Sequence, residues 1–373
     1  MSDRTKIPGE ADVGGRFLVV RFGAIGDCLR TLPAVRRLRR DRPLARIGWC
    51  VDRSVLPVLQ GNPNVDVFHP FDRGAVRRGA GPAFVEVRRL VSEVRAQDYT
   101  VVLDFHGRAK SGLIGGLSGA PTRIGYARKD VGELNWLFNT VHVSLDDSWK
   151  NRVQRFLDLL SALDLDTSFD PADTGLYVAP GVLDRAHRWY LEADEPSVAV
   201  YPGTSKARRR DRWPIPKWLE LLSQLGAMGV HSTVFWGPDE TDVVAAIAEK
   251  KIAGVGFAPP TSLPEMMAMI SCFRCYIGSD TAAMHMAWMQ GVPTVSFTSP
   301  KPVRTFEPLG PVPHRVLRAE RYLKPGTRES KQPVEVVTEV SVREAFDAVR
   351  TLLGSAQDEQ VAGSVGETDS VLA

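Results

Sequence analysis

Short apolar segments alternate with segments of helical periodicity along nearly the whole chain, and the full alternation occurs twice. Five expected strands fall in the first half, at 17–22, 46–51, 65–69, 99–105 and 123–126. Five more fall in the second half, at 197–201, 231–236, 275–278, 293–297 and 314–318. Strands that are separated by helices form βαβ units and a parallel sheet. The pattern therefore predicts an α/β protein of two doubly wound, Rossmann-like domains that face a ligand-binding cleft.

The segment from 166 to 180 is rich in Asp, Pro and Gly and interrupts the alternation, which places the domain boundary there. We expect an N-terminal domain over 16–172 and a C-terminal domain over 173–354. The last helix, 341–354, is expected to pack back on the N-terminal domain. Polar composition without periodicity predicts two disordered tails, 1–15 and the acidic 355–373.

The chain carries 47 basic and 44 acidic side chains, a formal charge of +3, but its tails are acidic and residues 15–354 alone carry +8. Domains that track nucleic-acid phosphates are usually more basic than this, so no nucleic-acid partner is expected. Four cysteines are too few for a disulfide framework. No segment has the length and apolar character of a signal peptide or a membrane span. These features favour the cytoplasm.

Seven arginines fall between Arg30 and Arg46, and most of them lie on the first expected helix. Arg36 and Arg40 lie one turn apart and could approach anionic lipid head groups, where each base contributes about 1 kcal/mol. Arginine is frequent throughout the chain, so a solvated helix face is the simpler explanation. Peripheral contact with an anionic membrane surface stays open.

The loop at 21–34 carries the expected first strand through Gly23 and Gly26 directly into a helix. Glycines let the backbone approach a ligand, and the helix start presents amides that favour an anion. Asp27 stands near the third glycine position of a dinucleotide-binding motif, which weakens the case for a nicotinamide cofactor. Two roles remain open for Asp27: the N-cap of the helix and a general base.

Two further loops combine small residues with bases. After the fourth strand, Gly107 permits a tight turn among His106, Arg108 and Lys110, which could face an acidic ligand. After the sixth strand, the segment 201–214 joins hydroxyl residues to five bases, a combination that suits a diphosphate. A solvated basic loop is the alternative in both cases.

The fourth loop, 278–297, places Asp280 and Thr281 at a helix start. His285 follows on the first turns of that helix, where it can reach the same ligand, although an Asp-Thr cap is the structural alternative. The CxxC at 272–275 lacks a partner pair at zinc-ligand spacing and is expected to be buried and non-functional. The chain contains neither a GxxxxGK[ST] phosphate loop nor a GxSxG nucleophile motif, which removes the simplest NTPase and hydrolase classes.

Together, these four loops resemble the heptosyltransferase family of glycosyltransferases, the lipopolysaccharide core enzymes and their relatives, which have the GT-B fold. The resembling segments are RFGAIGDCLRTLP (21–33), DFHGRAKS (104–111), 202–214 and GSDTAAMHMAWMQGVP (278–293). The resemblance extends over roughly 16–350. It implies an acceptor-binding N-terminal domain and a C-terminal domain that binds a nucleotide sugar.

The resemblance also implies roles for individual residues. Asp27 matches the general base that takes a proton from the acceptor hydroxyl. The matching positions on the acceptor side are Arg21, Gly26, Gly107 and Lys110. The positions that match donor-sugar or diphosphate contacts are Thr204, Ser205, Lys206, Arg210, Arg212, Asp280, Thr281, Ala282 and His285.

The implied reaction is inverting and independent of a metal. Heptose would pass from ADP-heptose to a phosphorylated glycolipid or oligosaccharide of the lipopolysaccharide-core type. The nucleotide sugar is a co-substrate, so no cofactor is expected. The resemblance further implies a monomer in the cytoplasm, with peripheral contact at the inner membrane as an open possibility.

Two positions depart from the family pattern. Asp211 stands where the family usually has lysine, so the leaving diphosphate would depend on Arg210 or Arg212. Ala282 replaces the usual glycine. These departures leave open a catalytically weak protein that binds a sugar nucleotide or glycolipid.

A nucleotide-dependent oxidoreductase is the third class, because Asp52 ends the second strand roughly where a ribose-binding acid belongs. The missing glycine and the second phosphate-type loop count against it.

Overall fold

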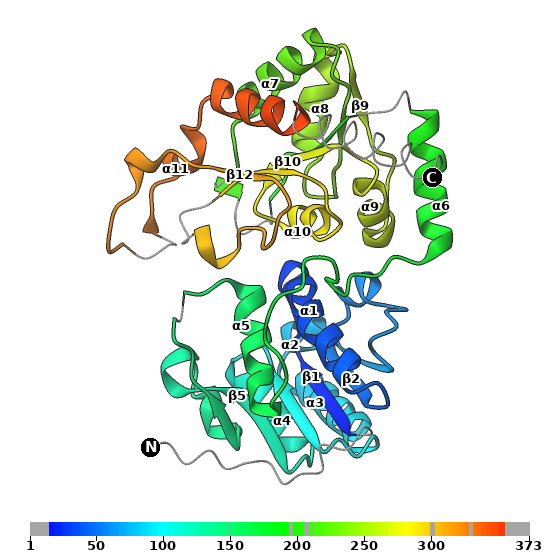
Figure 1. Ribbon diagram of the computed structural model, residues 1–373, viewed down its shortest axis with the longest axis vertical. Coiled ribbons are helices and arrows are strands. Elements are labelled where there is room, and N and C mark those ends of the chain that lie inside the picture. The colour runs from blue at the N-terminus through cyan, green and yellow to red at the C-terminus, as the bar shows by residue number, and fades with distance from the viewer. Residues whose placement is uncertain are drawn as a thin grey trace, which may run out of the picture. The chain divides into compact units, whose positions relative to one another are not determined.

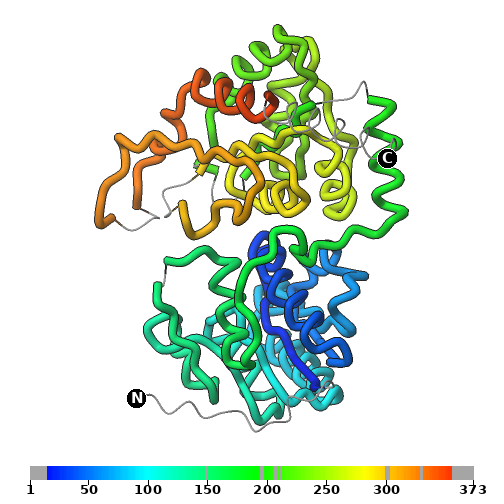
Figure 2. The backbone as a smooth tube through the Cα atoms, in the orientation of Figure 1, coloured from blue at the N-terminus to red at the C-terminus, as the bar shows by residue number. Residues whose placement is uncertain are grey.

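The computed structural model describes residues 15–147, 149–193, 197–204, 209–210, 212–298, 303–327 and 331–354. These residues form two compact units, which Figures 1 and 2 show in colours that follow the chain. Unit 1 comprises the chain up to Tyr177 together with Arg304–Gly310, and unit 2 comprises the rest. The units divide five residues after the expected boundary at 172, because residues 173–177 are held in unit 1: Asn62 Nδ2 donates to the Gly175 carbonyl at 2.9 Å.

Unit 1 is built on a six-stranded parallel sheet in the order β3-β2-β1-β4-β5-β6. Its strands are β1 Arg16–Val20, β2 Arg46–Asp52, β3 Val67–Phe71, β4 Val101–Asp104, β5 Thr122–Tyr126 and β6 Val141–Val143. Five of them match the expected strands. The sixth, β6, has only three residues and none is fully buried, so it lacks the apolar run that marks the others.

The helices of unit 1 are α1 Ile25–Asp41, α2 Arg73–Arg77, α3 Ala80–Arg95, α4 Ala109–Leu117 and α5 Arg152–Leu159. Short 3₁₀ turns occur at η1 Leu56–Val58, η2 Arg128–Asp130, η3 Asn135–Phe138 and η4 Leu160–Leu163. Leu90 and Val94 of α3 are fully buried against the sheet residues Leu18 and Val102. This apolar contact fixes α3 on the sheet.

Unit 2 repeats the architecture with a parallel sheet in the order β12-β11-β10-β7-β8-β9. Its strands are β7 Val198–Tyr201, β8 Ser232–Val234, β9 Val255–Phe257, β10 Cys275–Ser279, β11 Thr294–Phe297 and β12 His314–Leu317. Five again match the expected strands, while β9 is short and partly exposed. Counted from its own first strand, unit 2 has the same strand order as unit 1, so the doubly wound prediction holds for both.

The helices of unit 2 are α6 Pro180–Glu192, α7 Ile215–Ala227, α8 Thr241–Lys250, α9 Leu263–Ile270, α10 Ala282–Trp288, α11 Glu335–Thr338 and a last helix at 342–354. Two 3₁₀ turns follow late in the chain, η6 Val303–Thr305 at the crossing between the units and η7 Glu320–Tyr322. α9 and α10 contact each other and carry five buried methionines, Met266, Met267, Met269, Met284 and Met286, and a sixth, Met289, caps the end of α10.

The last helix differs from the expectation that it packs back on the N-terminal domain. Val342, Ala345, Val349 and Leu352 recur at helical spacing and are buried in the core of unit 2. A helix packs where its apolar stripe is buried, and this stripe belongs to the unit 2 core. No helix in the described ranges combines the length and apolar character that a bilayer span requires.

The Trp-Pro pair before α7 is anchored in the same core. The Trp213 ring stacks on Phe297 with 4.5 Å between centroids, and its indole Nε1 donates to the Val340 carbonyl at 3.0 Å. Burial of a tryptophan with its N–H satisfied is among the stronger local constraints available to a core. It fixes the segment that leads from the basic loop into α7.

Gly278, near the end of β10, has no room for a side chain. A Cβ built there would lie 2.6 Å from the Tyr201 carbonyl oxygen and would also meet the Tyr276 hydroxyl. We expect Gly278→Ala to destabilise the fold by about 1–3 kcal/mol through overpacking. Urea unfolding followed by fluorescence measures this.

Gly256→Ala is the matched control, since Gly256 lies on β9 of the same sheet and a Cβ there meets no atom within 4 Å. Equal unfolding midpoints for Gly278→Ala and Gly256→Ala would contradict the account of Gly278.

Candidate functional site

Arg21 joins the two central strands of the unit 1 sheet. It follows β1, and its Nη1 donates at 3.0 Å to the carbonyl of Phe105, directly after β4. β1 and β4 are neighbours in the sheet, and the strand order reverses between them. Doubly wound sheets bind their ligands beside the carboxyl ends of such a pair of strands. Arg21 is 8% exposed, so its guanidinium is largely buried at the carboxyl ends of these two strands.

Asp27 lies between two arginines at the start of α1. One carboxylate oxygen pairs with Arg30 Nη2 at 2.6 Å and the other with Arg21. The N-cap of α1 is Ala24, so the N-cap role considered for Asp27 is wrong: Asp27 is the third residue of the helix. Both arginine side chains are about a tenth exposed while Asp27 is 26% exposed. The arginines thus orient a carboxylate that remains accessible from solvent.

Gly26 contributes its backbone to the same arrangement. Its carbonyl accepts from Arg30 Nε at 3.3 Å, next to the ion pair between Arg30 and Asp27. The absence of a side chain on Gly26 leaves the backbone beside Asp27 uncovered.

The loop after β4 is built on Asp104, a residue to which the sequence alone gave no separate role. One Asp104 oxygen accepts from the backbone amides of His106 and Gly107 at 2.9 and 3.1 Å. The other accepts from Ser111 Oγ at 2.9 Å and Asn135 Nδ2 at 2.7 Å. Burial raises the pKa of Asp104, and these four donors act in the opposite direction. The sequence signal that could have predicted this role is an aspartate, Asp104, at the end of a strand and shortly before Gly107.

Gly107 adopts φ +66°, which favours glycine, and the turn brings Lys110 onto α4 beside the ring of Phe22 at 5.8 Å from its centroid. Burial, Arg73 and Arg21 together lower the pKa of Lys110. Burial, with Arg21 and Lys110, lowers the pKa of His106 to about 3. Burial is the largest cause of both pKa shifts, and the neighbouring basic side chains act in the same direction.

Asp52 does not present a free carboxylate for a ribose. One of its oxygens accepts from the backbone amide and the hydroxyl of Ser54 at 2.9 and 2.6 Å. The other pairs with Arg73 Nε at 2.8 Å. Asp52 is 3% exposed and organises the turn after β2. The geometry therefore removes the observation that favoured an oxidoreductase.

In unit 2, Thr204 follows β7 and is 6% exposed. Arg212 Nε donates to the Thr204 hydroxyl at 3.3 Å, and Arg212 Nη2 pairs with Glu240 at 3.0 Å. Glu240 is 3% exposed and packs against Gly203, where a side chain would collide with it. This buried carboxylate was missed in the sequence, because Glu240 lies in a polar turn typical of exposed loops. Arg212 therefore serves as an internal counter-ion that braces Thr204.

The remaining residues expected on the basic loop are only partly described. Ser205, Lys206 and Asp211 lie outside the described residues. Arg210 is described and exposed.

Asp280 and His285 face each other after β10, which is paired with β7 at the centre of the unit 2 sheet. His285 Nε2 lies 3.9 Å from Asp280 Oδ1. Trp288 Nε1 donates to His285 Nδ1 at 3.0 Å, so this nitrogen is an acceptor and the ring proton resides on Nε2, toward Asp280. Thr281 is the N-cap of α10 and Ala282 its first residue. Trp288, which is 2% exposed, thus fixes this tautomer from within the core.

The structure thus brings the expected residues together in two groups, one in each unit. The group at the β1 and β4 ends comprises Arg21, Gly26, Asp27, Gly107 and Lys110. The group at the β7 and β10 ends comprises Thr204, Arg212, Asp280, Thr281, Ala282 and His285. Within the described ranges, no three His, Cys, Asp or Glu side chains form a metal-binding group.

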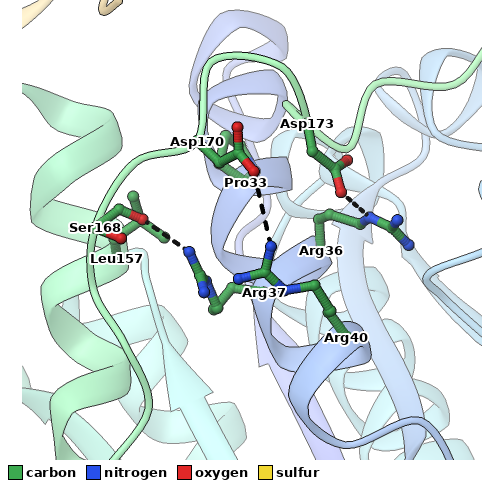
Figure 3. Close-up of a pocket in the computed structure, with 8 residues that line it drawn as sticks. All are labelled: Pro33, Arg36, Arg37, Arg40, Leu157, Ser168, Asp170 and Asp173. Atoms are coloured by element: carbon green, nitrogen blue, oxygen red, sulfur yellow. Dashed lines mark hydrogen bonds and ion pairs between the residues drawn. The ribbon is translucent and has the colours of Figure 1, made fainter.

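The arginine face of α1 is occupied by the segment that follows α5. Arg36 pairs with Asp173 at 2.6 Å and Arg40 with Asp170 at 3.7 Å, while Arg37 Nη2 donates to the Ser168 carbonyl at 3.2 Å. Figure 3 shows the three arginines reaching separate partners on that segment, and these residues line a small pocket together with Pro33. Arg36 and Arg40, the residues considered for lipid contact, are thereby neutralised within the unit.

Comparison with known proteins gives a consistent family. The model of glycosyltransferase family 9 (heptosyltransferase) matches residues 87–333. Lipopolysaccharide heptosyltransferase 1 of Salmonella typhimurium is 22% identical over 76% of this chain and 88% of its own length. The Pseudomonas aeruginosa protein of the same name is 24% identical over 76% of this chain and 79% of its length.

Solved structures share the fold. The glycosyl transferase family 9 protein of Veillonella parvula has a TM-score of 0.75 at 20% identity, covering 91% of this chain and 97% of its own. The Escherichia coli heptosyltransferase WaaC, solved with ADP-2-deoxy-2-fluoro heptose, has a TM-score of 0.71 at 20% identity, with 90% and 99% covered. These similarities assign the GT-B type of fold. Since the family model matches more than half of the chain, the protein belongs to glycosyltransferase family 9, the heptosyltransferases.

Proposed function

We propose that this protein transfers heptose from ADP-heptose to a phosphorylated glycolipid or oligosaccharide of the lipopolysaccharide-core type, with inversion at the anomeric carbon and with Asp27 as general base. The observation that carries the proposal is the Asp27 carboxylate, oriented by Arg21 and Arg30 and 26% exposed at a sheet crevice. The relatives named lipopolysaccharide heptosyltransferase and the WaaC complex with a fluorinated ADP-heptose support the acceptor and donor classes.

On the acceptor side, the O–H bond of the acceptor hydroxyl breaks and Asp27 takes the proton. The oxygen of that hydroxyl forms a bond to the anomeric carbon of the donor sugar. The bond between that carbon and the diphosphate oxygen breaks, and ADP leaves with the electron pair. Arg21 and Lys110 supply positive charge for a phosphate on the acceptor, and burial with neighbouring arginines lowers the pKa of Lys110. General-base catalysis of this kind contributes roughly 10²–10⁴ to the rate.

On the donor side, Asp280 and His285 offer an acceptor and a donor of hydrogen bonds to sugar hydroxyls, with the Nε2 proton of His285 fixed by Trp288. Thr204, braced by Arg212, offers a hydroxyl and backbone to the diphosphate. The ion pair of Arg212 with the buried Glu240 assigns Arg212 a positioning role, so we propose that Arg210 and Lys206 neutralise the departing diphosphate.

Asp27→Asn should lower kcat for heptose transfer by at least about 10²-fold, because an amide cannot accept the acceptor proton. ADP affinity, measured by calorimetry, should stay within about twofold, since the proposed donor contacts lie on unit 2. Product is measured by mass spectrometry with ADP-heptose and a phosphorylated core acceptor.

Asp41→Asn is the matched control. Asp41 ends the same helix, is also 26% exposed and also contacts an arginine, Arg40, at 3.5 Å. Transfer by Asp27→Asn at the wild-type rate would rule out the proposed base. Donor binding by the wild-type protein with no product from any acceptor would instead favour the catalytically weak binding protein.

His106 is the competing base near Asp27, and its titration separates the two. Burial, Arg21 and Lys110 lower its pKa to about 3, so it accepts a proton poorly at neutral pH. We expect His106→Gln to retain more than a tenth of wild-type transfer. If His106→Gln lowered the transfer rate as much as Asp27→Asn, His106 would be a candidate for the general base in place of Asp27.

The lowered pKa of His106 also affects stability. The unfolded histidine binds a proton near pH 6.5 while the folded one does not until about pH 3, so this group's contribution is full above pH 6.5 and is lost as the pH falls toward 3. The urea midpoint should therefore fall less between pH 7.5 and 5.0 in His106→Gln than in the wild type. His142→Gln, at an exposed histidine, should keep the wild-type slope.

The proposed mechanism assigns leaving-group stabilisation to side chains and backbone amides, so transfer should continue at the wild-type rate in EDTA. The rate is measured after dialysis against chelator, with and without added Mg²⁺. A loss in EDTA that Mg²⁺ restores would transfer that role to a cation.

A further inference from the structure

The outward face of α3 is apolar where solvent is expected. Phe84 and Val85 are 68% and 66% exposed. At 100° per residue, Val85 lies on the side of the helix opposite Leu90 and Val94, which are fully buried in the core, and Phe84 lies at the flank of that exposed side. Val76, on the preceding helix α2, is a further exposed apolar side chain, with 50% of its surface accessible. Large side chains at such exposure are unusual when they adjoin each other on one element.

The same segment is basic. Residues 73–85 contain three arginines and no acidic residue. Arg88 follows one turn after Phe84 on the same face of α3. Within the described part of the chain, Arg77 and Arg88 have no hydrogen bond or ion pair to another side chain, and both are exposed. Charge and apolar surface thus occur together.

This face contrasts with the more arginine-rich α1. There, Arg36 and Arg40 are paired with the aspartates of a single segment. Arg77 and Arg88 lack such partners and can pair with anions from outside the unit. An apolar surface bordered by unpaired arginines complements a bilayer whose head groups are anionic and whose interior is apolar.

We propose that Val76, Phe84 and Val85, with Arg77 and Arg88, form a docking face for an anionic lipid bilayer. Phe84 and Val85 enter the boundary between head groups and acyl chains while the two guanidinium groups pair with lipid phosphates. Only the purpose of this docking face rests on the proposed function: the face would hold the enzyme at the membrane surface where a glycolipid acceptor resides. Figures 1 and 2 show α2 and α3 in unit 1.

Cosedimentation of the full-length protein with vesicles tests the proposal. The probes are vesicles of phosphatidylcholine alone and of phosphatidylcholine with 30% phosphatidylglycerol, at 50 and 300 mM salt. We expect binding to the anionic vesicles, at least tenfold weaker binding to the neutral ones, and weakening by salt. Binding to neither kind of vesicle would overturn the proposal.

Two variants separate the apolar and the charged contributions. Phe84→Ser with Val85→Ser should lower the partition coefficient on anionic vesicles at least tenfold. Arg77→Glu with Arg88→Glu should lower it at least as much and remove the salt dependence. These exposed positions have no described contact that folding requires, and thermal melting checks this.

The controls alter the same properties elsewhere. Leu191→Ser removes a 70% exposed apolar side chain from α6, and Arg343→Glu with Arg350→Glu makes the same change in net charge on the last helix. Both should bind vesicles as the wild type does. Equal losses in controls and test variants would overturn the proposal, since net charge and exposed apolar area alone would then explain binding.

A second copy of the chain is the other candidate for this face. Concentration-dependent sedimentation that Phe84→Ser abolishes, without vesicle binding, would assign the face to it and overturn the lipid proposal. Transfer from ADP-heptose to a water-soluble, deacylated acceptor should be unchanged in the variants. Failure of that transfer in the wild type would count against the proposed function and leave the vesicle result unaffected.

Discussion

The order of the strands is the constraint on which the rest of the structure depends. In each sheet two strands that are distant in sequence, β1 with β4 and β7 with β10, lie side by side at the centre. Crossover connections are right-handed, so chains that leave such a pair turn away from one another and leave a crevice that backbone cannot fill. The four loops with unusual chemistry follow these four strands. Their residues meet because the topology brings the strand ends together.

Buried carboxylates then determine the shape of these loops. Asp104 collects four donors and Asp52 three partners, and Glu240 holds the guanidinium that braces Thr204. A buried charge is tolerated only when it is paired and hydrogen-bonded, so each of these acids fixes several backbone groups at once. Asp27 differs from them because it pairs with two arginine side chains while a quarter of its side chain remains exposed. That difference is the reason why Asp27, and not one of the buried acids, is proposed as the base.

Periodicity predicted ten of the strands because each falls in a short apolar or β-branched run between segments of helical spacing. It missed β6 and β9, which have three residues each and few buried side chains. The resemblance proposed Asp27, Asp280 and His285 as site residues. Sequence alone could not exclude Asp27 as the N-cap of its helix, since that depends on Ala24 ending the loop. Nor could it detect that Glu240 is buried or that Arg212 is its counter-ion, because those contacts join residues from separate loops.

The methionines of α9, α10 and the residue after α10 give this part of unit 2 a property of their own. Six unbranched thioether side chains are buried on these two contacting helices and at the end of α10, the helix that carries His285. Methionine has three rotatable bonds and a polarisable sulfur, so it refills space after small displacements at lower cost than the branched residues of a rigid core. Small displacements of the helix that bears His285 can therefore be refilled by methionine side chains without opening a cavity.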